Sequence, residues 1–259
     1  MPARQPQRFE YVFVVTYGRS GSTLLQGLLN ALPRVVVRGE NSLFVLQLYR
    51  AWAQASTFRE RHKGHRPRKV QSAFYGIRDL RRRQFTVATR HLMTKFLLGS
   101  LNRSDVDVIG FKEVLWHEVK PRETEGFFDF MDAAFPGARY ILNQRAHDHV
   151  ATSGFWQRHD SDEVFAALER VEKMQEFLRR TRPERTYDCR YELITHEDPA
   201  ISSAQLRGLA EFVTGSCDDA LLARLHETRA VAFGPKAFQA SQRRRESDGE
   251  HGQDAPDRV

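Results

Sequence analysis

Short apolar runs, rich in β-branched and aromatic residues, recur along the chain between longer stretches with helical spacing. Five of these runs predict strands, at residues 11–16, 34–38, 106–110, 138–143 and 186–191. Strands that alternate with helical patterns favour an α/β fold, a parallel sheet flanked by helices in a single domain. Ligands of such sheets bind at the carboxyl ends of the strands.

The first predicted strand runs into a loop of small residues and then into a helix, a layout typical of phosphate binding. Gly18 and Gly21 allow the backbone to bend and to approach a ligand closely. Ser22 or Thr23 can cap the helix, whose free N–H groups and positive dipole end then face an anion in the loop. Nucleotide triphosphate loops carry a lysine directly before the Ser/Thr. Here the cation lies upstream, at Arg19.

A second anion-binding pair follows the predicted strand at 138–143. Arg145 lies at the end of this strand, and Ser153 lies eight residues later on the next predicted helix. An arginine fork and a hydroxyl placed in this way can converge on one phosphate. Taken alone, such a pair is common by chance, so its weight comes from the first loop. His147 and His149 lie between Arg145 and Ser153 in sequence and are expected at the surface or behind these phosphate-binding residues.

Both motifs resemble those of sulfotransferases that use 3′-phosphoadenosine 5′-phosphosulfate (PAPS) as sulfuryl donor. The loop 19–23 resembles the 5′-phosphosulfate loop of that family, and Arg145 with Ser153 resembles its 3′-phosphate signature. The segment 186–194 is similar to a late strand that supplies a tyrosine near the adenine. Tyr191 is the matching residue, and a tyrosine that only packs is the open alternative. In motif style the chain resembles bacterial carbohydrate and tyrosylprotein sulfotransferases most, and this resemblance implies a P-loop-like sheet.

The resemblance implies a division of roles at the donor site. Ser20, Gly21, Ser22 and Thr23 would hold the 5′-phosphate through amides and hydroxyls, while Arg19 stabilises the bridging oxygen as its bond to sulfur breaks. No divalent ion is then needed, and no His, Cys or Glu set has zinc-ligand spacing. We therefore expect PAPS as co-substrate and no metal.

The acceptor needs a base, and the resemblance favours Glu40, which follows the second predicted strand just before a helix expected near residues 41–42. Partial burial would raise the pKa of this carboxyl toward working pH. A carboxylate that only favours the helix dipole is the alternative. Lys112 is assigned a contact to the sulfonate or the substrate, and Glu113 is expected beyond the third strand, facing the donor or the acceptor. His117 is the second candidate base.

Charge and composition narrow the function classes. The chain has 259 residues and a net charge of +7, with basic runs at 59–69, 78–83 and 243–245. Such runs are usually solvated, although a basic cleft would also attract PAPS. No nucleic-acid-binding motif accompanies them, and no segment reads as a membrane span or signal peptide, so we expect a cytoplasmic protein that does not bind nucleic acid. Cys189 and Cys217 lack metal or disulfide spacing and are expected to pack in the interior.

The domain is predicted to cover residues 11–240. An N-terminal extension (1–10) precedes it, and a disordered tail (241–259) follows, because that stretch is almost free of apolar residues. The segment 231–236 resembles, weakly, a loop that closes over the cofactor in cytosolic sulfotransferases. A turn after the final helix is the equal alternative.

The insertion at 41–105 is expected to form the wall or lid of the acceptor pocket, a usual place for specificity in α/β enzymes. Trp52 is assigned to the core on its helical spacing. Phe58, Phe74 and Tyr75 fit either the core or stacking on a sugar or aromatic ring.

Taken together, the motifs predict a sulfotransferase that moves the sulfuryl group of PAPS in line onto a hydroxyl or amine of a small-molecule or carbohydrate acceptor. The alternative is a P-loop kinase for a small molecule, which would want a loop lysine and an aspartate-ended apolar strand for magnesium. A third hypothesis is a non-enzymatic anion- or nucleotide-binding module. It would be favoured if Glu40 faced away from the loop.

Overall fold

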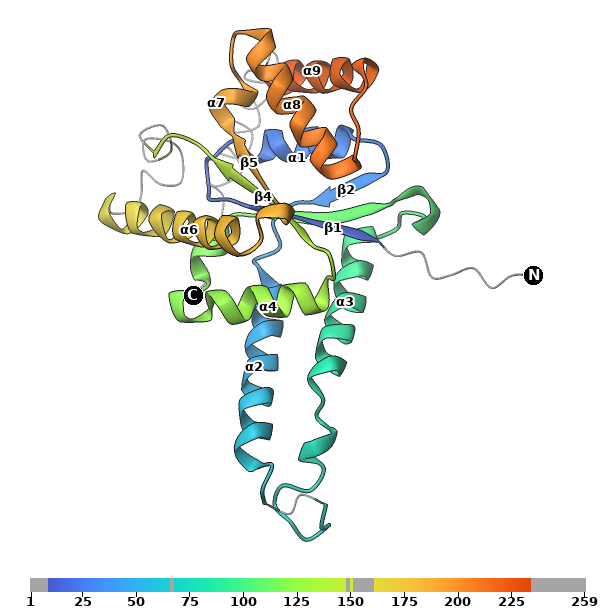
Figure 1. The fold of residues 1–259 in the computed structure, drawn as a ribbon, viewed down its shortest axis with the longest axis vertical. Helices are drawn as coiled ribbons and strands as arrows, with labels where there is room; N and C mark the ends of the chain where they lie inside the picture. The colour runs from blue at the N-terminus through green and yellow to red at the C-terminus, as the bar shows by residue number, and fades with distance from the viewer. Residues whose placement is uncertain (1–8, 66–67, 148–149, 151–160, 234–259) are drawn as a thin grey trace, which may run out of the picture.

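The computed structural model describes residues 9–65, 68–147, 150 and 161–233 (Figure 1). Five strands form one parallel sheet in the order β2-β3-β1-β4-β5. The strands are β1 (Glu10–Val15), β2 (Val35–Arg38), β3 (Val108–Glu113), β4 (Arg139–Gln144) and β5 (Thr186–Arg190). Because all strands are parallel, their carboxyl ends meet at one edge of the sheet. The predicted α/β architecture is confirmed.

Alternate residues of the central strand β1 enter two separate cores. Tyr11, Phe13 and Val15 pack on one face of the sheet, and Val12 and Val14 pack on the other. A strand buried on both faces is apolar throughout, which is why this run lacks the alternation of a half-exposed strand. Each of these side chains stabilises the fold by about 1.5–3 kcal/mol through burial.

Helices cover both faces of the sheet (Figure 1). The first core includes residues of α2, α3, α4 and α6, and the second includes residues of α1, α8 and α9. The helices are α1 (Ser22–Ala31), α2 (Phe44–His62), α3 (Arg82–Leu98), α4 (Thr124–Ala134), α6 (Ser161–Thr181), α7 (Tyr191–Ile194), α8 (Pro199–Thr214) and α9 (Asp219–Phe233). Short 3₁₀ turns are η1 (Ile77–Asp79), η2 (Arg103–Asp105), η3 (Leu115–Glu118), η4 (Pro121–Glu123) and η6 (Pro183–Arg185).

Helices α2 and α3 form an arm that projects from the body (Figure 1). Tyr49 and Trp52 anchor its base on α4, with ring centroids 5.8 and 5.3 Å from that of Phe130. Trp52 thus packs against the core, as predicted. Beyond this base the two helices run outward and are joined at the tip. The insertion at 41–105 was expected to form the wall or lid of the acceptor pocket. Its outer part points away from the body, because the side chains that anchor it lie at the base of the arm.

Two element boundaries depart from the sequence pattern near the candidate base. β3 includes Lys112 and Glu113 as its last residues, whereas the sequence pattern placed them after the strand. α2 begins later than expected, at Phe44, because Ser42 and Leu43 have left-handed backbone with φ of 56° and 45°. Two consecutive non-glycine residues with left-handed backbone mark a strained turn, and backbone strain is concentrated at functional sites.

Candidate active site

The loop after β1 has the backbone that a phosphate site requires. Arg19 and Gly21 adopt left-handed conformations, with φ of 67° and 78°. Gly21 is the N-cap of α1, not Ser22 or Thr23 as the sequence suggested, and no side chain caps this helix. The first amides of a helix have no intrahelical partner and carry the positive end of its dipole. The loop can therefore receive an anion.

Ser20 braces this loop from inside. Its hydroxyl lies 2.6 Å from Thr16 Oγ1, and the residue is fully buried. Asn143 of β4 donates to Thr16 Oγ1 (3.0 Å) and to the Ser20 carbonyl (3.2 Å). The hydroxyl of Ser20, predicted to hold a phosphate, is therefore engaged by the protein. Ser22 is also buried, whereas Thr23 is exposed, so the Thr23 hydroxyl is the side-chain group of this loop that is most open to an anion from solvent.

The guanidinium of Arg145 meets the β1 loop. Its Nη1 donates to the Arg19 carbonyl at 3.1 Å, and its Cζ lies 4.2 Å from the centroid of the Tyr191 ring. The same ring packs so closely on Gly21 that a Cβ there would lie 2.0 Å from Tyr191 Cδ2. The Nε of Arg145 is buried and has no hydrogen-bond partner among the described residues. The predicted residues 19–23, 145 and 191 are thus brought together at one site.

Tyr17 fixes the backbone of Arg145. Its hydroxyl donates to the Arg145 carbonyl at 2.8 Å and accepts from the Arg145 N–H at 3.0 Å. Burial raises the pKa of Tyr17 to about 12, so the phenol stays protonated and able to donate. Behind it, the His147 ring meets Tyr17 edge-on, and His147 Nε2 lies 2.8 Å from Glu172 Oε1. His147 therefore supports the site from behind, whereas the sequence pattern did not point to Tyr17.

Glu40 and Lys112 form an ion pair at the carboxyl edge of the sheet. Lys112 Nζ lies 2.6 Å from Glu40 Oε1, and the side chains are 5% and 52% exposed, respectively. The expected burial of Glu40 is not found, because its carboxylate lies at the rim, where a group from solvent can reach it. The lysine is held inside the sheet and orients this carboxylate.

Glu113 anchors the loop between β2 and α2. Its fully buried carboxylate accepts from the N–H groups of Asn41 (2.9 Å) and Leu43 (2.8 Å) through Oε2. Through Oε1 it accepts from those of Val114 (2.7 Å) and Leu115 (3.1 Å). The sequence suggested that Glu113 faces donor or acceptor; it faces backbone instead. Two of these four charge-assisted bonds hold the strained turn before α2, and the other two hold the segment after β3.

His117, the second candidate base, lies in the 3₁₀ turn η3. Burial lowers the pKa of His117, which favours the neutral ring. Its Nδ1 is buried without a partner among the described residues, and its Nε2 lies 3.9 Å from Glu118 Oε1. The carbonyl of His117 accepts from Arg170 Nη1 at 3.0 Å. These contacts tie His117 to its neighbour and to α6 rather than to the β1 loop.

Several predicted positions lie outside the described residues. They are Ser153, His149, residues 234–236 of the proposed covering loop, and the tail at 241–259. Their predicted roles stay predictions.

The described residues show neither a cluster of metal-binding side chains nor a membrane-spanning helix. Among those residues, no group of three or more His, Cys, Asp or Glu side chains could hold a metal ion. No described helix combines the length and the apolar character that a bilayer crossing requires. Cys189 and Cys217 are free and buried, and burial raises the pKa of both thiols. They pack in the interior, as predicted.

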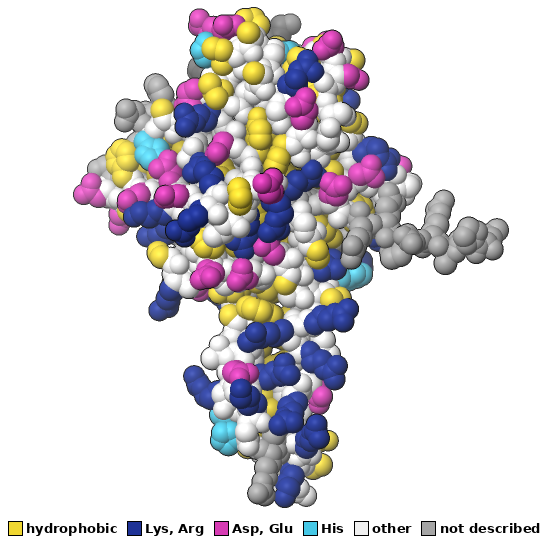
Figure 2. All heavy atoms as spheres, viewed as in Figure 1, with side chains coloured by type: hydrophobic (Ala, Val, Ile, Leu, Met, Phe, Trp, Pro, Cys, Tyr) yellow, Lys and Arg dark blue, Asp and Glu magenta, His cyan; other side chains and the backbone are white. Residues whose placement is uncertain are grey.

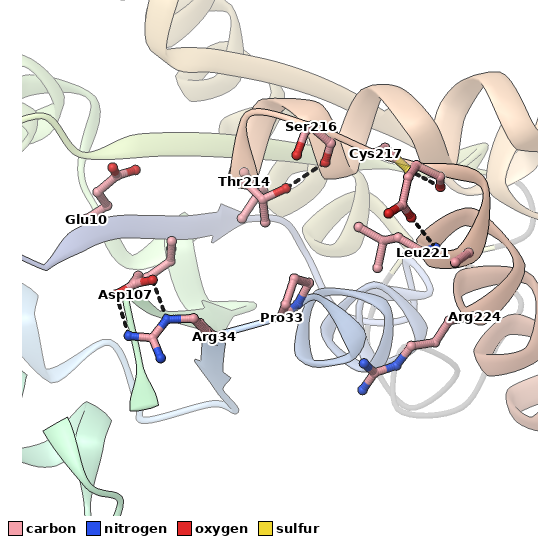
Figure 3. A pocket seen from close by; sticks show the side chains of 13 residues that line it. Glu10, Pro33, Arg34, Asp107, Thr214, Ser216, Cys217, Leu221 and Arg224 are labelled. Carbon is pink, nitrogen blue, oxygen red and sulfur yellow. Dashed lines mark hydrogen bonds and ion pairs between the residues drawn. The ribbon is translucent and has the colours of Figure 1, made fainter. Parts of the chain in front are cut away.

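A separate hollow of about 880 Å³ lies at the opposite edge of the sheet (Figure 3). Its lining includes Glu10 at the start of β1, Arg34 and Asp107 just before β2 and β3, and Arg224 of α9. Arg34 donates to Asp107 from Nε at 2.5 Å and from Nη2 at 2.8 Å, so its charge is already paired. Ligands of open α/β sheets bind at the carboxyl ends of the strands, which favours the β1 loop as the active site.

The residues at the β1 loop can bind anionic groups at two places. The amides of the left-handed turn at Gly21 offer one binding position, and the buried Arg145 Nε, which lacks a protein acceptor among the described residues, offers a second. The contact between Gly21 and the Tyr191 ring leaves no room for a Cβ, so only glycine permits this arrangement.

Comparison with known proteins gives a family match over most of the chain. Residues 11–213 match the family model described as "Sulfotransferase family". The fold is similar to the sulfotransferase domain of the olefin synthase from Synechococcus PCC 7002, at 16% identity and a TM-score of 0.51 over 92% of this chain and 86% of that one. Sulfotransferase STF9 from Mycobacterium avium is 11% identical, with a TM-score of 0.43 over 89% and 69%. No curated protein matches the sequence. The family match covers most of the chain, and the protein therefore belongs to the sulfotransferase family.

Proposed function

We propose that the protein moves the sulfuryl group of PAPS in line onto a hydroxyl or amine of its acceptor, without a metal ion and with Glu40 as base. Membership of the family supports sulfuryl transfer in general. The observation that carries the finer proposal is the contact between Arg145 and the β1 loop, 3.1 Å from Nη1 to the Arg19 carbonyl across 126 positions of sequence. Two anion-binding elements at one site suit a nucleotide that is phosphorylated at both 5′ and 3′ positions.

The donor would be held by the β1 loop and Arg145. Amides at the start of α1 and the Thr23 hydroxyl bind the 5′-phosphate, favoured by the helix dipole. Arg145, with Ser153, binds the 3′-phosphate, since the planar guanidinium offers paired donors. Tyr191, already in contact with the Arg145 guanidinium, supplies an aromatic surface on the adenine side.

Transfer then requires a base and a positive charge near the leaving oxygen. Glu40 takes the proton of the acceptor hydroxyl, the acceptor oxygen forms a bond to sulfur, and the bond from sulfur to the 5′-phosphate oxygen breaks. Arg19 stabilises the negative charge that the leaving phosphate gains, so 3′-phosphoadenosine 5′-phosphate and the sulfated acceptor are released. Lys112 pairs with Glu40 and orients it, and in this proposal it also contacts the moving sulfuryl group. The exposed carboxylate suits a sugar-type or small-metabolite hydroxyl that arrives from solvent.

A thermal shift assay tests the donor class. We expect 3′-phosphoadenosine 5′-phosphate without magnesium to raise the melting temperature, and ATP with magnesium to raise it much less, because a ligand that binds only the folded state stabilises it. The opposite ranking would favour a P-loop kinase.

Two substitutions test the assigned residues. Arg145→Ala should weaken binding of the 3′-phosphorylated nucleotide far more than of the analogue without that phosphate, whereas Arg180→Ala, at an exposed position of α6, should change neither. Equal losses for both nucleotides would remove the assignment of Arg145. With an acceptor found by screening with radiolabelled donor, Glu40→Gln should lower turnover by about a hundredfold or more and leave nucleotide affinity unchanged. Unchanged turnover would move the role to His117.

A further inference from the structure

The positive charge of this protein is concentrated in the α2–α3 arm. Residues 44–98 contain thirteen Lys and Arg residues against two acidic ones, Glu60 and Asp79, a net charge of +11. The whole chain carries +7, so the remainder carries −4. The rest of the chain therefore has a net negative charge, and the arm accounts for all of the positive excess. Figure 2 shows Lys and Arg side chains over the lower half of the arm.

Most of this charge is not used inside the protein. Among the described residues of the arm, the ion pairs are those of Arg50 with Glu123 and Lys63 with Glu60. The first lies at the base of the arm, and the second joins neighbours on one helix. Near the tip, Arg59 is half-buried, whereas the exposed basic residues are Arg61, Lys63, Arg68, Lys69, Arg78 and Arg82. Like charges held close together repel one another in the free protein, so an anionic partner would be favoured there.

Four basic side chains border a groove near the tip. Arg59 and Lys63 of the α2 end and Arg78 and Arg82 of the facing segment line a hollow of about 530 Å³, together with Ser56 and Glu60. The Lys63 carbonyl accepts from Arg78 Nη2 at 3.1 Å, which draws the two sides together. A hollow of this size, with cations on both sides, suits a phosphate-bearing headgroup.

Large apolar side chains are exposed beside this charge. Of the ten that are exposed among the described residues, six belong to the arm. Three of these lie near its tip, where Val70 is 70% exposed, Tyr75 59% and Phe58 44%. Figure 2 shows hydrophobic side chains among the basic ones at the tip. Phe74 stacks on His62 with ring centroids 4.0 Å apart, and Phe58 contacts both rings, so the tip has packing of its own while Val70 and Tyr75 stay exposed.

Basic and exposed apolar side chains at one tip favour one class of anionic partner over the others. A nucleic acid or an acidic polysaccharide would be bound by the charge alone, through phosphate or sulfate contacts, and would gain little from exposed Val70. Anionic lipid bilayers reward both features, because basic residues contact headgroups while aliphatic and aromatic side chains enter the interface. The arm also ends in a narrow tip that projects farthest from the body, which suits a flat partner better than an enclosed ligand (Figure 1).

We propose that the tip of the α2–α3 arm, residues 58–65 and 68–82, docks on the surface of an anionic lipid bilayer. Arg59, Lys63, Arg78 and Arg82 bind headgroup phosphates, and Val70 and Tyr75 enter the interface. The protein would then lie on the membrane without spanning it. The base of the arm adjoins the Glu40 loop, so docking would hold the acceptor side of the sheet at a fixed distance from the bilayer.

Vesicle sedimentation tests the proposal, in the absence of donor and acceptor so that its outcome is independent of sulfuryl transfer. We expect the protein to bind vesicles of equal parts phosphatidylcholine and phosphatidylglycerol at low salt and not vesicles of phosphatidylcholine alone. Arg78→Glu with Arg82→Glu should lower the partition coefficient at least about tenfold. Arg122→Glu with Arg180→Glu, the same charge change on exposed positions of the body, should lower it less than about twofold, because salt screens distant charges.

The apolar contribution has its own readout. Val70→Ser with Tyr75→Ser should lower vesicle binding severalfold and leave the melting temperature unchanged, since both side chains are exposed in the free protein. Val70→Trp, which keeps the tip intact, should give fluorescence emission that shifts to shorter wavelength on the anionic vesicles. No vesicle binding, an equal loss in the body variant, or no spectral shift would overturn the proposal. So would tighter binding to heparin or DNA that does not change in Val70→Ser with Tyr75→Ser.

Discussion

The site has a donor half, the β1 loop with Arg145, and an acceptor half, the turn that carries Glu40. Replacing Glu113 with glutamine should disturb the acceptor half and leave the donor half intact. The carboxylate accepts four backbone N–H bonds, two of them from the turn that precedes α2. The oxygen of a glutamine side chain can accept two of these four hydrogen bonds. Its amide nitrogen is itself a donor, so it would leave the other two N–H groups without an acceptor. Each buried donor left without an acceptor costs about 1–3 kcal/mol, so we expect a loss of about 3 kcal/mol in the free energy of unfolding.

For a protein of this size, that loss corresponds to a fall of roughly 6–12 °C in melting temperature. Glu118→Gln makes the same chemical change on a side chain that is 60% exposed, and it should stay within about 0.5 kcal/mol of the wild type. Calorimetry or circular dichroism on the two variants measures the difference directly.

The functional consequence should be selective. Because Glu113 holds the turn next to Glu40 and has no described contact with Arg145, Glu113→Gln should lower turnover while the affinity for 3′-phosphoadenosine 5′-phosphate stays within about twofold. A melting temperature within about 2 °C of the wild type would refute the energetic reasoning. A loss of nucleotide affinity parallel to the loss of turnover would refute the separation of the two halves.

Three further outcomes follow from the geometry of the site. Gly21→Ala should lower nucleotide affinity more than about tenfold, measured by calorimetry, because the new Cβ strains a left-handed residue and meets the Tyr191 ring; normal affinity would show that the ring can move away. Tyr17→Phe should cost about 1–2 kcal/mol of stability and weaken the 3′-phosphorylated nucleotide, since the Arg145 backbone loses both bonds to the hydroxyl; unchanged affinity would contradict the positioning role. The pKa of His117 is lowered by burial, so its contribution to stability is present above the ordinary value of about 6.5 and is lost as pH falls below it. His117→Gln should therefore flatten the dependence of stability on pH between about 7 and 5, followed by urea unfolding, and an unchanged slope would contradict the burial.

The sequence predicts the β1 loop well because every feature that defines it is local. A buried strand, two glycines and an arginine within a few positions suffice to indicate a left-handed turn before a helix. The position of Arg145 beside this loop could be predicted as well, since neighbouring parallel strands place their ends at one edge. Local spacing and sheet topology together account for the donor half.

Residues that act through distant backbone could not be predicted in the same way. Glu113 reaches N–H groups 70 and 72 positions away, and Tyr17 reaches Arg145 over 128 positions. A glutamate at a strand end reads as a group that faces ligand, because no local pattern reveals that four amides will surround it. The direction of the arm could not be predicted from local patterns either, since it depends on packing of Tyr49 and Trp52 against α4.

The ligand-facing groups of the donor half and the acceptor half differ in exposure, and this difference matches their proposed tasks. On the donor side, Thr16, Ser20 and Asn143 form a buried network, and Gln175 of α6 donates to the carbonyls of Val15 (2.9 Å) and Asn143 (3.2 Å). On the acceptor side, the exposed Glu40 carboxylate has a single described partner and follows β2 at the edge of the sheet. A donor that is the same in every turnover benefits from preorganised groups, because no reorganisation is needed at the moment of reaction. The exposed Glu40 side chain, on a turn whose backbone Glu113 fixes, can instead adjust to hydroxyl groups of different shape. Changes of acceptor specificity should therefore arise by substitution of the side chains around Glu40 and at the base of the arm, with the β1 loop unaltered.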